Sequence, residues 1–107
     1  MGRPKNRRNQ KTSDAGKILD RLIGDDPKLR RRVEAARLSM RVAQMIYDAR
    51  AKAGLTQAQL AELVGTTQSV ISRLEDADYE GHSLSMLQRI ADALHRRVEI
   101  RFVPEVA

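Results

Sequence analysis

The sequence predicts an all-α fold with a long N-terminal helical extension and one C-terminal β-strand. Residues 54–75, GLTQAQLAELVGTTQSVISRLE, hold two short apolar patterns of helical period separated by Gly65. From Pro27 to Ala53 no residue interrupts a helix. Over residues 98–103, VEIRFV, apolar and charged side chains alternate, and this is the only strand pattern in the chain.

The first short helix of residues 54–75 is expected to begin after Thr56, a residue type that caps helix N-termini. The run QAQLAELV then places Leu60, Ala61 and Val64 on one helical face. Gly65 follows where a left-handed residue would end the helix.

The second short helix is expected to begin at once, with Thr66 as its N-cap. Ile71 and Leu74 face inward at helical spacing, with Val70 beside them. Two helices this short, with so short a turn, must cross at a steep angle, which is the helix-turn-helix geometry. The side chains left outside carry amides, hydroxyls and a guanidinium, which can read base edges in a major groove; they are Thr67, Gln68, Ser69, Ser72 and Arg73.

Residues 54–75 resemble the helix-turn-helix of lambdoid phage repressors and the wider XRE class, in the caps, the turn glycine and the apolar spacing. The resemblance implies a lambda-repressor-like helix-turn-helix bundle over residues 41–97 that binds double-stranded DNA. It implies that Gln57 binds a phosphate and braces Gln68. The DNA-binding residues expected on this basis are Thr56, Gln57, Thr66, Thr67, Gln68, Ser69, Ser72 and Arg73.

The same resemblance implies an internal salt bridge between Arg50 and Glu75, which match a pair in such repressors. One departure concerns the loop after the recognition helix, where the phage proteins carry basic residues. This chain has Asp76, Asp78 and Glu80 there, so that loop is not expected to supply phosphate contacts. Arg73 could equally pair with Asp76 or Asp78, and two capped helices around a glycine also suit other small helical bundles.

The chain carries a formal net charge of +6, which suits a polyanionic partner, but the charge is uneven. Residues 1–12 hold five basic groups and no acid, whereas residues 41–107 hold eight basic and nine acidic groups. The helix-turn-helix region must therefore hold phosphates by geometry and helix N-termini rather than by bulk charge. Residues 1–13 read as a disordered basic arm, either a free tail or, through the AT-hook-like GRPK, a minor-groove contact.

Residues 14–40 are expected to form a helical N-terminal extension. Ser13 or Asp14 can cap a helix to about Ile23, and Asp26 with Pro27 starts the long helix. Its expected inward stripe is Leu29, Val33, Ala36, Met40, Ala43 and Tyr47. The first half of that stripe either packs on its own domain or is covered by a partner.

After Glu75, Ser83 is expected to cap a helix whose core face is Leu84, Leu87, Ile90, Ala91 and Leu94. Residues 98–107 are expected to be a dimerisation strand and tail, since a lone strand needs a partner strand from another chain. The pairing residues would be Val98, Glu99, Ile100, Arg101 and Phe102, before Pro104 ends the strand.

With these flanks, residues 15–104 resemble HigA-type antitoxins of type II toxin–antitoxin systems. The resemblance implies a homodimer that represses its own operon from an inverted-repeat operator and neutralises a small basic RelE/HigB-type ribonuclease toxin. It places the toxin contact ahead of the helix-turn-helix. The expected toxin-binding residues are Ile18, Leu19, Leu22, Ile23, Leu29 and Val33.

Catalysis has little support in the sequence, because two histidines and no cysteine offer neither metal-ligand spacing nor thiol chemistry. We expect no cofactor, no metal, no small-molecule ligand and no membrane span, and a cytoplasmic protein that is not an enzyme. Two alternatives stay open. One is a solitary XRE-type transcriptional repressor without a toxin, and the other is a protein-interaction scaffold that keeps the fold without DNA affinity.

Overall fold

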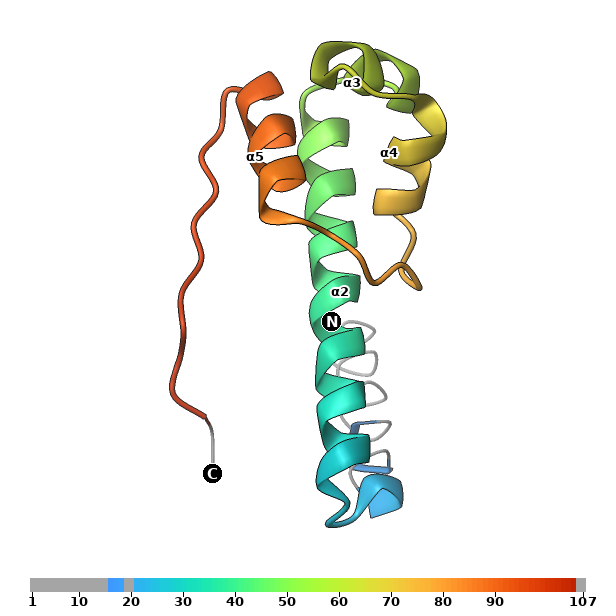
Figure 1. The fold of residues 1–107 in the computed structure, drawn as a ribbon, viewed down its shortest axis with the longest axis vertical. Coiled ribbons are helices and arrows are strands. Elements are labelled where there is room, and N and C mark those ends of the chain that lie inside the picture. The colour runs from blue at the N-terminus through green and yellow to red at the C-terminus, as the bar shows by residue number, and fades with distance from the viewer. Residues whose placement is uncertain (1–15, 19–20, 106–107) are drawn as a thin grey trace, which may run out of the picture. The chain divides into compact units, whose positions relative to one another are not determined.

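The computed structural model describes residues 16–18 and 21–105. Residues 16–18 and 21–23 are helical, and four longer helices follow them (Figure 1). Those helices are α2 (Pro27–Lys52), α3 (Gln57–Val64), α4 (Gln68–Leu74) and α5 (Leu84–Ala93). The predicted caps Ser13 and Asp14, the predicted contact residue Leu19 and the basic arm lie outside the described residues.

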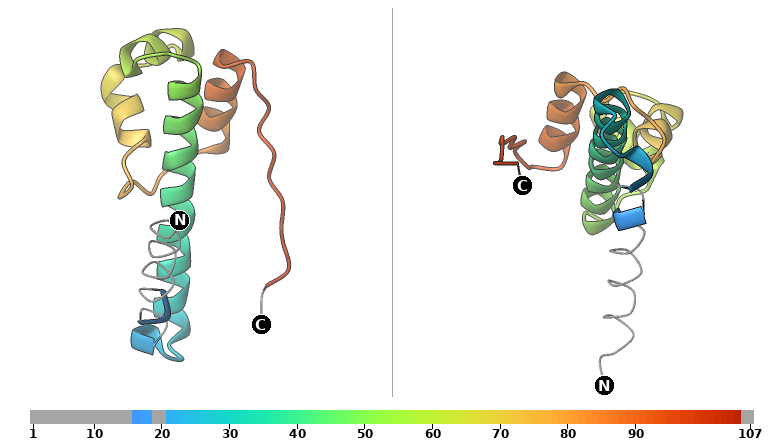
Figure 2. Two further views of the ribbon diagram at one scale, coloured as in Figure 1. Left: turned by 180° about the vertical axis from the view of Figure 1, so that it is seen from behind. Right: turned by 90° about the horizontal axis from the view of Figure 1, so that it is seen from below.

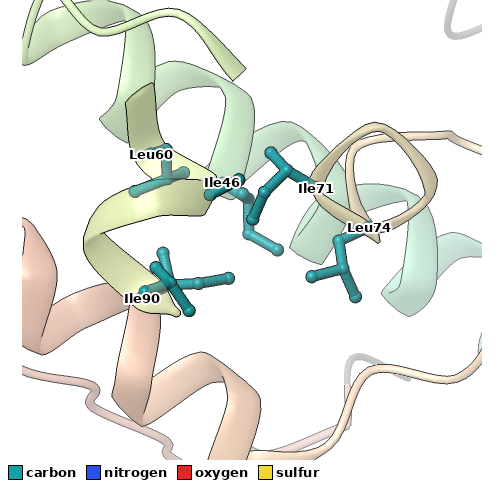
Figure 3. Close-up of a cluster of buried hydrophobic side chains, with 7 residues drawn as sticks. Ile46, Leu60, Ile71, Leu74 and Ile90 are labelled. Atoms are coloured by element: carbon teal, nitrogen blue, oxygen red, sulfur yellow. The ribbon is translucent and has the colours of Figure 1, made fainter. Parts of the chain in front are cut away.

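The chain forms two units, Met1–Ala35 and Ala36–Ala107, and each is described by itself. In the second unit the C-terminal half of α2 lies between α5 and α4, as the views in Figures 1 and 2 agree. Four helices contribute to one buried apolar cluster (Figure 3). Its buried members are Ile46, Leu60, Ala61, Val64, Ile71, Leu74 and Ile90.

In the first unit, Asp26 caps α2 as the sequence predicts. Its carboxylate Oδ1 accepts hydrogen bonds from the backbone N–H of Lys28 at 3.0 Å and of Leu29 at 3.3 Å. Pro27 then occupies the first helical position, where its missing N–H costs nothing. The long helix is confirmed over Pro27–Lys52.

The α3 cap and the turn that ends α3 are also confirmed. The Thr56 hydroxyl accepts from the Gln59 N–H at 3.1 Å, and the Gln59 side-chain oxygen accepts from the Thr56 N–H at 2.8 Å, a reciprocal capping box. Gly65 adopts φ 81° and ψ 38°, the left-handed conformation that glycine takes without strain. The N–H of Gly65 and that of Thr66 both donate to the Ala61 carbonyl at 2.9 Å.

The predicted N-cap of α4 is wrong by one residue. Thr67, not Thr66, has the extended backbone of a cap, and its side chain accepts from the Val70 N–H at 3.3 Å. The reason lies in the preceding turn. Because the Thr66 N–H closes the end of α3 on the Ala61 carbonyl, Thr66 still belongs to that helix terminus and the next helix starts one residue later.

The predicted inward stripe of α2 is only partly correct. Ala43 is buried, but Met40 and Tyr47 are exposed, and Ile46 takes the core position that the prediction missed. The predicted spacings of four and three average 3.6 residues over this stretch, as in a straight α-helix, so the period of the stripe is correct but its position on the helix is not. In the second unit the buried face of α2 is the one that carries Ala43 and Ile46, and Met40 and Tyr47 lie beside it.

The Ser83 cap of α5 is confirmed, since its hydroxyl accepts from the Met86 N–H at 3.1 Å. Ile90 is buried and its helical neighbours on that face are half-buried, but the predicted core residue Leu84 is 62% exposed. Leu84 is the first residue of α5 and lies at the edge of the apolar stripe, so little of the domain packs over it.

The predicted C-terminal strand is not seen. Residues 95–105 have neither helix nor strand structure and run as an extended segment (Figure 1). Val98 is half-buried, whereas Ile100 and Phe102 are exposed. A β-ladder needs a second strand for its backbone groups, and the described part of this single chain offers none.

Candidate nucleic-acid interface

The outer face of α4 carries four exposed polar side chains. Ile71 and Leu74 are buried in the core, which turns Gln68, Ser69, Ser72 and Arg73 toward solvent. Within the described residues none of these four side chains has a hydrogen-bonding partner in the protein. Amide, hydroxyl and guanidinium groups are thus presented together from one short helix, free to bind another molecule.

The three threonines of the predicted interface are less free. Thr56 and Thr67 are exposed, but each hydroxyl oxygen accepts a hydrogen bond as the cap of its helix. Thr66 is half-buried in the turn between the two helices. The cap hydroxyls keep their O–H to donate outward, so they suit a phosphate oxygen better than a base edge.

A partly buried ion pair joins the end of α2 to the end of α4. The Arg50 Nε donates to Glu75 Oε2 at 2.7 Å, and Arg50 Nη2 donates to Glu75 Oε1 at 2.9 Å. The two side chains are 12% and 4% exposed. The pair expected from the resemblance is therefore present, with the two parallel hydrogen bonds that a guanidinium can make to a carboxylate.

The same network also holds the start of α3. The Gln57 side-chain amide donates to Glu75 Oε1 at 3.1 Å, and Arg50 Nη1 donates to the Leu55 carbonyl at 2.8 Å. Gln57 is thus bonded to Glu75, and it does not brace Gln68 as the resemblance implied. Residues from the end of α2, the start of α3 and the end of α4 meet in this cluster, which fixes the direction of α4.

The charge on Arg50 is stabilised by its surroundings. The hydrogen bond to Glu75 raises the pKa of Arg50 above its ordinary value, and the attraction of the Glu75 carboxylate adds to this against the opposing effect of burial. The guanidinium also lies 5.1 Å from the centre of the Tyr47 ring. Folding therefore favours the protonated form of Arg50.

Two further contacts hold α4 and its turn, and sequence reasoning missed both. Arg89 of α5 donates from Nη2 to the Val64 carbonyl at 2.8 Å, which satisfies a terminal carbonyl of α3. His82 Nε2 lies 2.8 Å from the Leu74 carbonyl oxygen at the end of α4. Each partner is a backbone carbonyl, which every residue has, so no periodicity or motif marks it.

The acidic loop after α4 is self-contained. The Asp76 carboxylate accepts from the Asp78 N–H at 2.8 Å, and Tyr79 packs against the core. Neither aspartate pairs with Arg73, so the alternative of a surface ion pair for that guanidinium is not realised. Among the described residues, Arg73 has no ionic partner and lies on the outer face of α4.

In this arrangement α4 is held firmly by its neighbours and presents its polar face outward, as a helix that binds a larger partner would. A comparison with known families agrees with this interpretation. A model of a helix-turn-helix family, HTH_3, matches residues 46–100, which is just over half of the chain. The chain belongs to this XRE-type helix-turn-helix family of DNA-binding regulators. The curated proteins and the solved structures gave no match to it.

The described residues hold neither a membrane-spanning helix nor a metal-binding cluster. No helix among them is both long and apolar enough to cross a membrane. No cluster of three or more histidine, aspartate or glutamate side chains in that part of the chain is placed to hold a metal ion.

Proposed function

We propose that this regulator is a repressor that binds an inverted-repeat operator as a homodimer. The observation that carries the proposal is the outer face of α4, where four polar side chains have no hydrogen-bonding partner among the described residues while Arg50, Glu75 and Gln57 hold the helix in place. Such side chains form hydrogen bonds to base edges when a helix enters a major groove.

We assign base recognition to Gln68 and Arg73. An amide can bond adenine at two positions and a guanidinium can bond guanine at two positions, so both side chains can discriminate bases. Gln57 instead stands at the first position of α3, where backbone N–H groups lack helical acceptors and attract phosphate. Because its side chain is bonded to Glu75, we expect its contact with the DNA backbone to use mainly its N–H group.

The test is fluorescence anisotropy on a duplex from the region upstream of the gene and on a duplex of scrambled sequence. Gln68→Ala and Arg73→Ala should each cost about 1–3 kcal/mol on the upstream duplex and little on the scrambled one. Gln57→Ala removes the side chain that ties the start of α3 to Glu75, so it should weaken binding to both duplexes alike. Gln88→Ala, an exposed glutamine on α5, is the matched control and should change neither. If Gln68→Ala and Arg73→Ala both kept the preference for the upstream duplex over the scrambled one, the assignment of base recognition to these residues would be wrong.

The homodimer is proposed to form by antiparallel pairing of residues 98–103 about a two-fold axis near Ile100. In this register Val98 lies opposite Phe102 of the partner, and Glu99 lies opposite Arg101, so each polar position meets an opposite charge. The exposure of Ile100 and Phe102 supports the proposal. Two recognition helices about one DNA turn apart, ~34 Å, would then require an inverted repeat.

We also propose that residues 14–40 bind a partner protein, and that this partner is a RelE/HigB-type toxin. Large apolar side chains exposed in the N-terminal unit favour it, above all Leu22, which is 75% exposed, with Ile18 and Leu29. Ile23 is buried, so it is withdrawn from the expected anchors. A solitary repressor and a scaffold without DNA affinity are the competing functions.

Co-purification of the tagged protein from its native operon tests the antitoxin role. Leu22→Glu should abolish capture of a small basic protein encoded beside it. Leu63→Glu is the matched control, because Leu63 is a similarly exposed leucine on α3 and the change should not affect capture. Absence of any co-purifying protein with the unaltered chain would favour the solitary repressor.

A further inference from the structure

A groove with apolar walls lies between α2 and α5. Its volume is about 280 Å³, and most of the residues that line it are apolar. Met45 on its α2 side is an exposed methionine, so part of the apolar wall is open to water. The lining residues used below are Met45, Ala49, Ala91, Leu94 and Val98.

The C-terminal segment leaves from the rim of this groove and carries uncovered apolar side chains. Val98 and Glu99 line the groove, and the chain then runs on extended past Ile100 (Figure 1). Phe102 is fully exposed and is the only phenylalanine in the sequence. The same stretch of chain therefore carries an open apolar groove and an uncovered aromatic side chain. The groove has no apolar side chain inside it, and the aromatic side chain has no apolar surface over it.

The tail of the same chain is poorly suited to fill its own groove. From Val98 to Phe102 an extended chain advances ~13 Å away from the rim. Only three residues separate Val98 from Phe102, so Phe102 could reach its own groove only through a tight turn of the backbone. That segment contains no glycine or asparagine, and Ile100 at its centre is β-branched, which disfavours the conformations that such turns need.

We propose that the groove receives Phe102 of a second copy of this chain, and that the exchange is reciprocal. Antiparallel pairing about Ile100 puts Phe102 of the partner subunit opposite Val98, which is itself a wall of the groove. The same pairing sets Glu99 against Arg101 of the partner subunit at the groove rim. The inference rests on the proposed dimer and goes beyond it, because it names the side chain that anchors each protomer and the pocket that holds it.

Sedimentation equilibrium of the full chain tests the anchor. Phe102→Ala should weaken the dimer by at least ~100-fold, since two aromatic side chains are lost per dimer and each anchor of this kind is commonly worth tenfold or more. Leu63→Ala is the matched control, an exposed apolar side chain on α3 outside residues 98–103, and should change the dimer constant by less than ~3-fold. Circular dichroism should show both variants as helical as the unaltered protein.

A volume exchange and a cross-link test the pocket. Ala91→Phe fills the groove from its own wall, so it should also weaken the dimer by excluding Phe102 of the partner subunit. The double variant Ala91→Phe, Phe102→Ala removes that clash and should recover part of the affinity lost in Ala91→Phe. Benzoylphenylalanine at position 102, irradiated in a mixture of ¹⁴N and ¹⁵N chains, should cross-link light chains to heavy ones at Met45 or Leu94.

Four outcomes would overturn the inference, and they differ from one another. A monomeric unaltered chain would remove the proposed dimer together with the inference. A dimer that keeps its affinity in Phe102→Ala would leave the dimer and remove only the Phe102 anchor. Cross-links confined within one chain, or a different molecule found in the groove by native mass spectrometry, would assign the groove another occupant.

Discussion

Replacing Glu75 by glutamine should destabilise the helix-turn-helix unit strongly. The substitution keeps the shape of the side chain but removes the negative charge that faces the Arg50 guanidinium through two hydrogen bonds. Both side chains are almost fully removed from water, so the remaining positive charge cannot regain its hydration. Leaving one partner of a buried ion pair uncompensated costs roughly 3–5 kcal/mol.

The lower end of that range is expected here. Arg50 still donates to the Leu55 carbonyl and still lies over the Tyr47 ring in the variant, so about 3 kcal/mol is the estimate. For a domain of this size that loss lowers the melting temperature by ~15 °C. Because the pKa of Arg50 is raised on folding, rising pH would remove the Arg50 contribution only as it passes the raised value.

Urea unfolding followed by circular dichroism at 222 nm measures this change. Glu62→Gln is the matched control, because Glu62 is an exposed glutamate on α3, and it should lie within about 0.5 kcal/mol of the unaltered protein. If Glu75→Gln were as stable as Glu62→Gln, the pair would not hold α4 in place and the reasoning would fail.

The remaining predictions concern the backbone around the interface. Thr67→Ala should lower the free energy of unfolding in urea by about 1 kcal/mol, whereas Thr66→Ala should lower it clearly less, because only Thr67 caps α4. Equal losses in the two variants would contradict the assignment of Thr67 as the cap. His95 has φ 56°, so His95→Gly should raise the melting temperature by relieving about 1 kcal/mol of strain, and a fall would contradict this. Arg89→Met should cost about 1–2 kcal/mol by stranding the Val64 carbonyl, with Arg97→Met as an exposed control.

Local chemistry made most of the fold predictable. Thr56, Asp26 and Ser83 each precede a helical pattern, and a short polar side chain at that place has one favourable use. Gly65 was predictable because a left-handed residue is needed where one helix ends and another begins. The choice between Thr66 and Thr67 was not, since two adjacent threonines have the same capping chemistry and only the geometry of the preceding turn decides between them.

Contacts between residues distant in the sequence were harder to predict. The pairing of Arg50 with Glu75 came through the resemblance to repressors, because nothing in the spacing of 25 residues between them indicates it. Arg89 reads as an ordinary solvated charge on a helix until its carbonyl partner is placed beside it. The groove between α2 and α5 depends on the packing of two helices and a tail, which no one-dimensional pattern records.

The account claims above all that α4 reads DNA sequence on behalf of a two-fold dimer. Selection of binding sites from a randomised duplex library, followed by sequencing, measures this directly with the unaltered chain, Gln68→Ala and Arg73→Ala. The unaltered chain should enrich an inverted repeat with half-sites about one helical turn apart, and each variant should lose preference at particular positions within both half-sites. Enrichment of no motif, or of a motif that both variants select unchanged, would contradict the account.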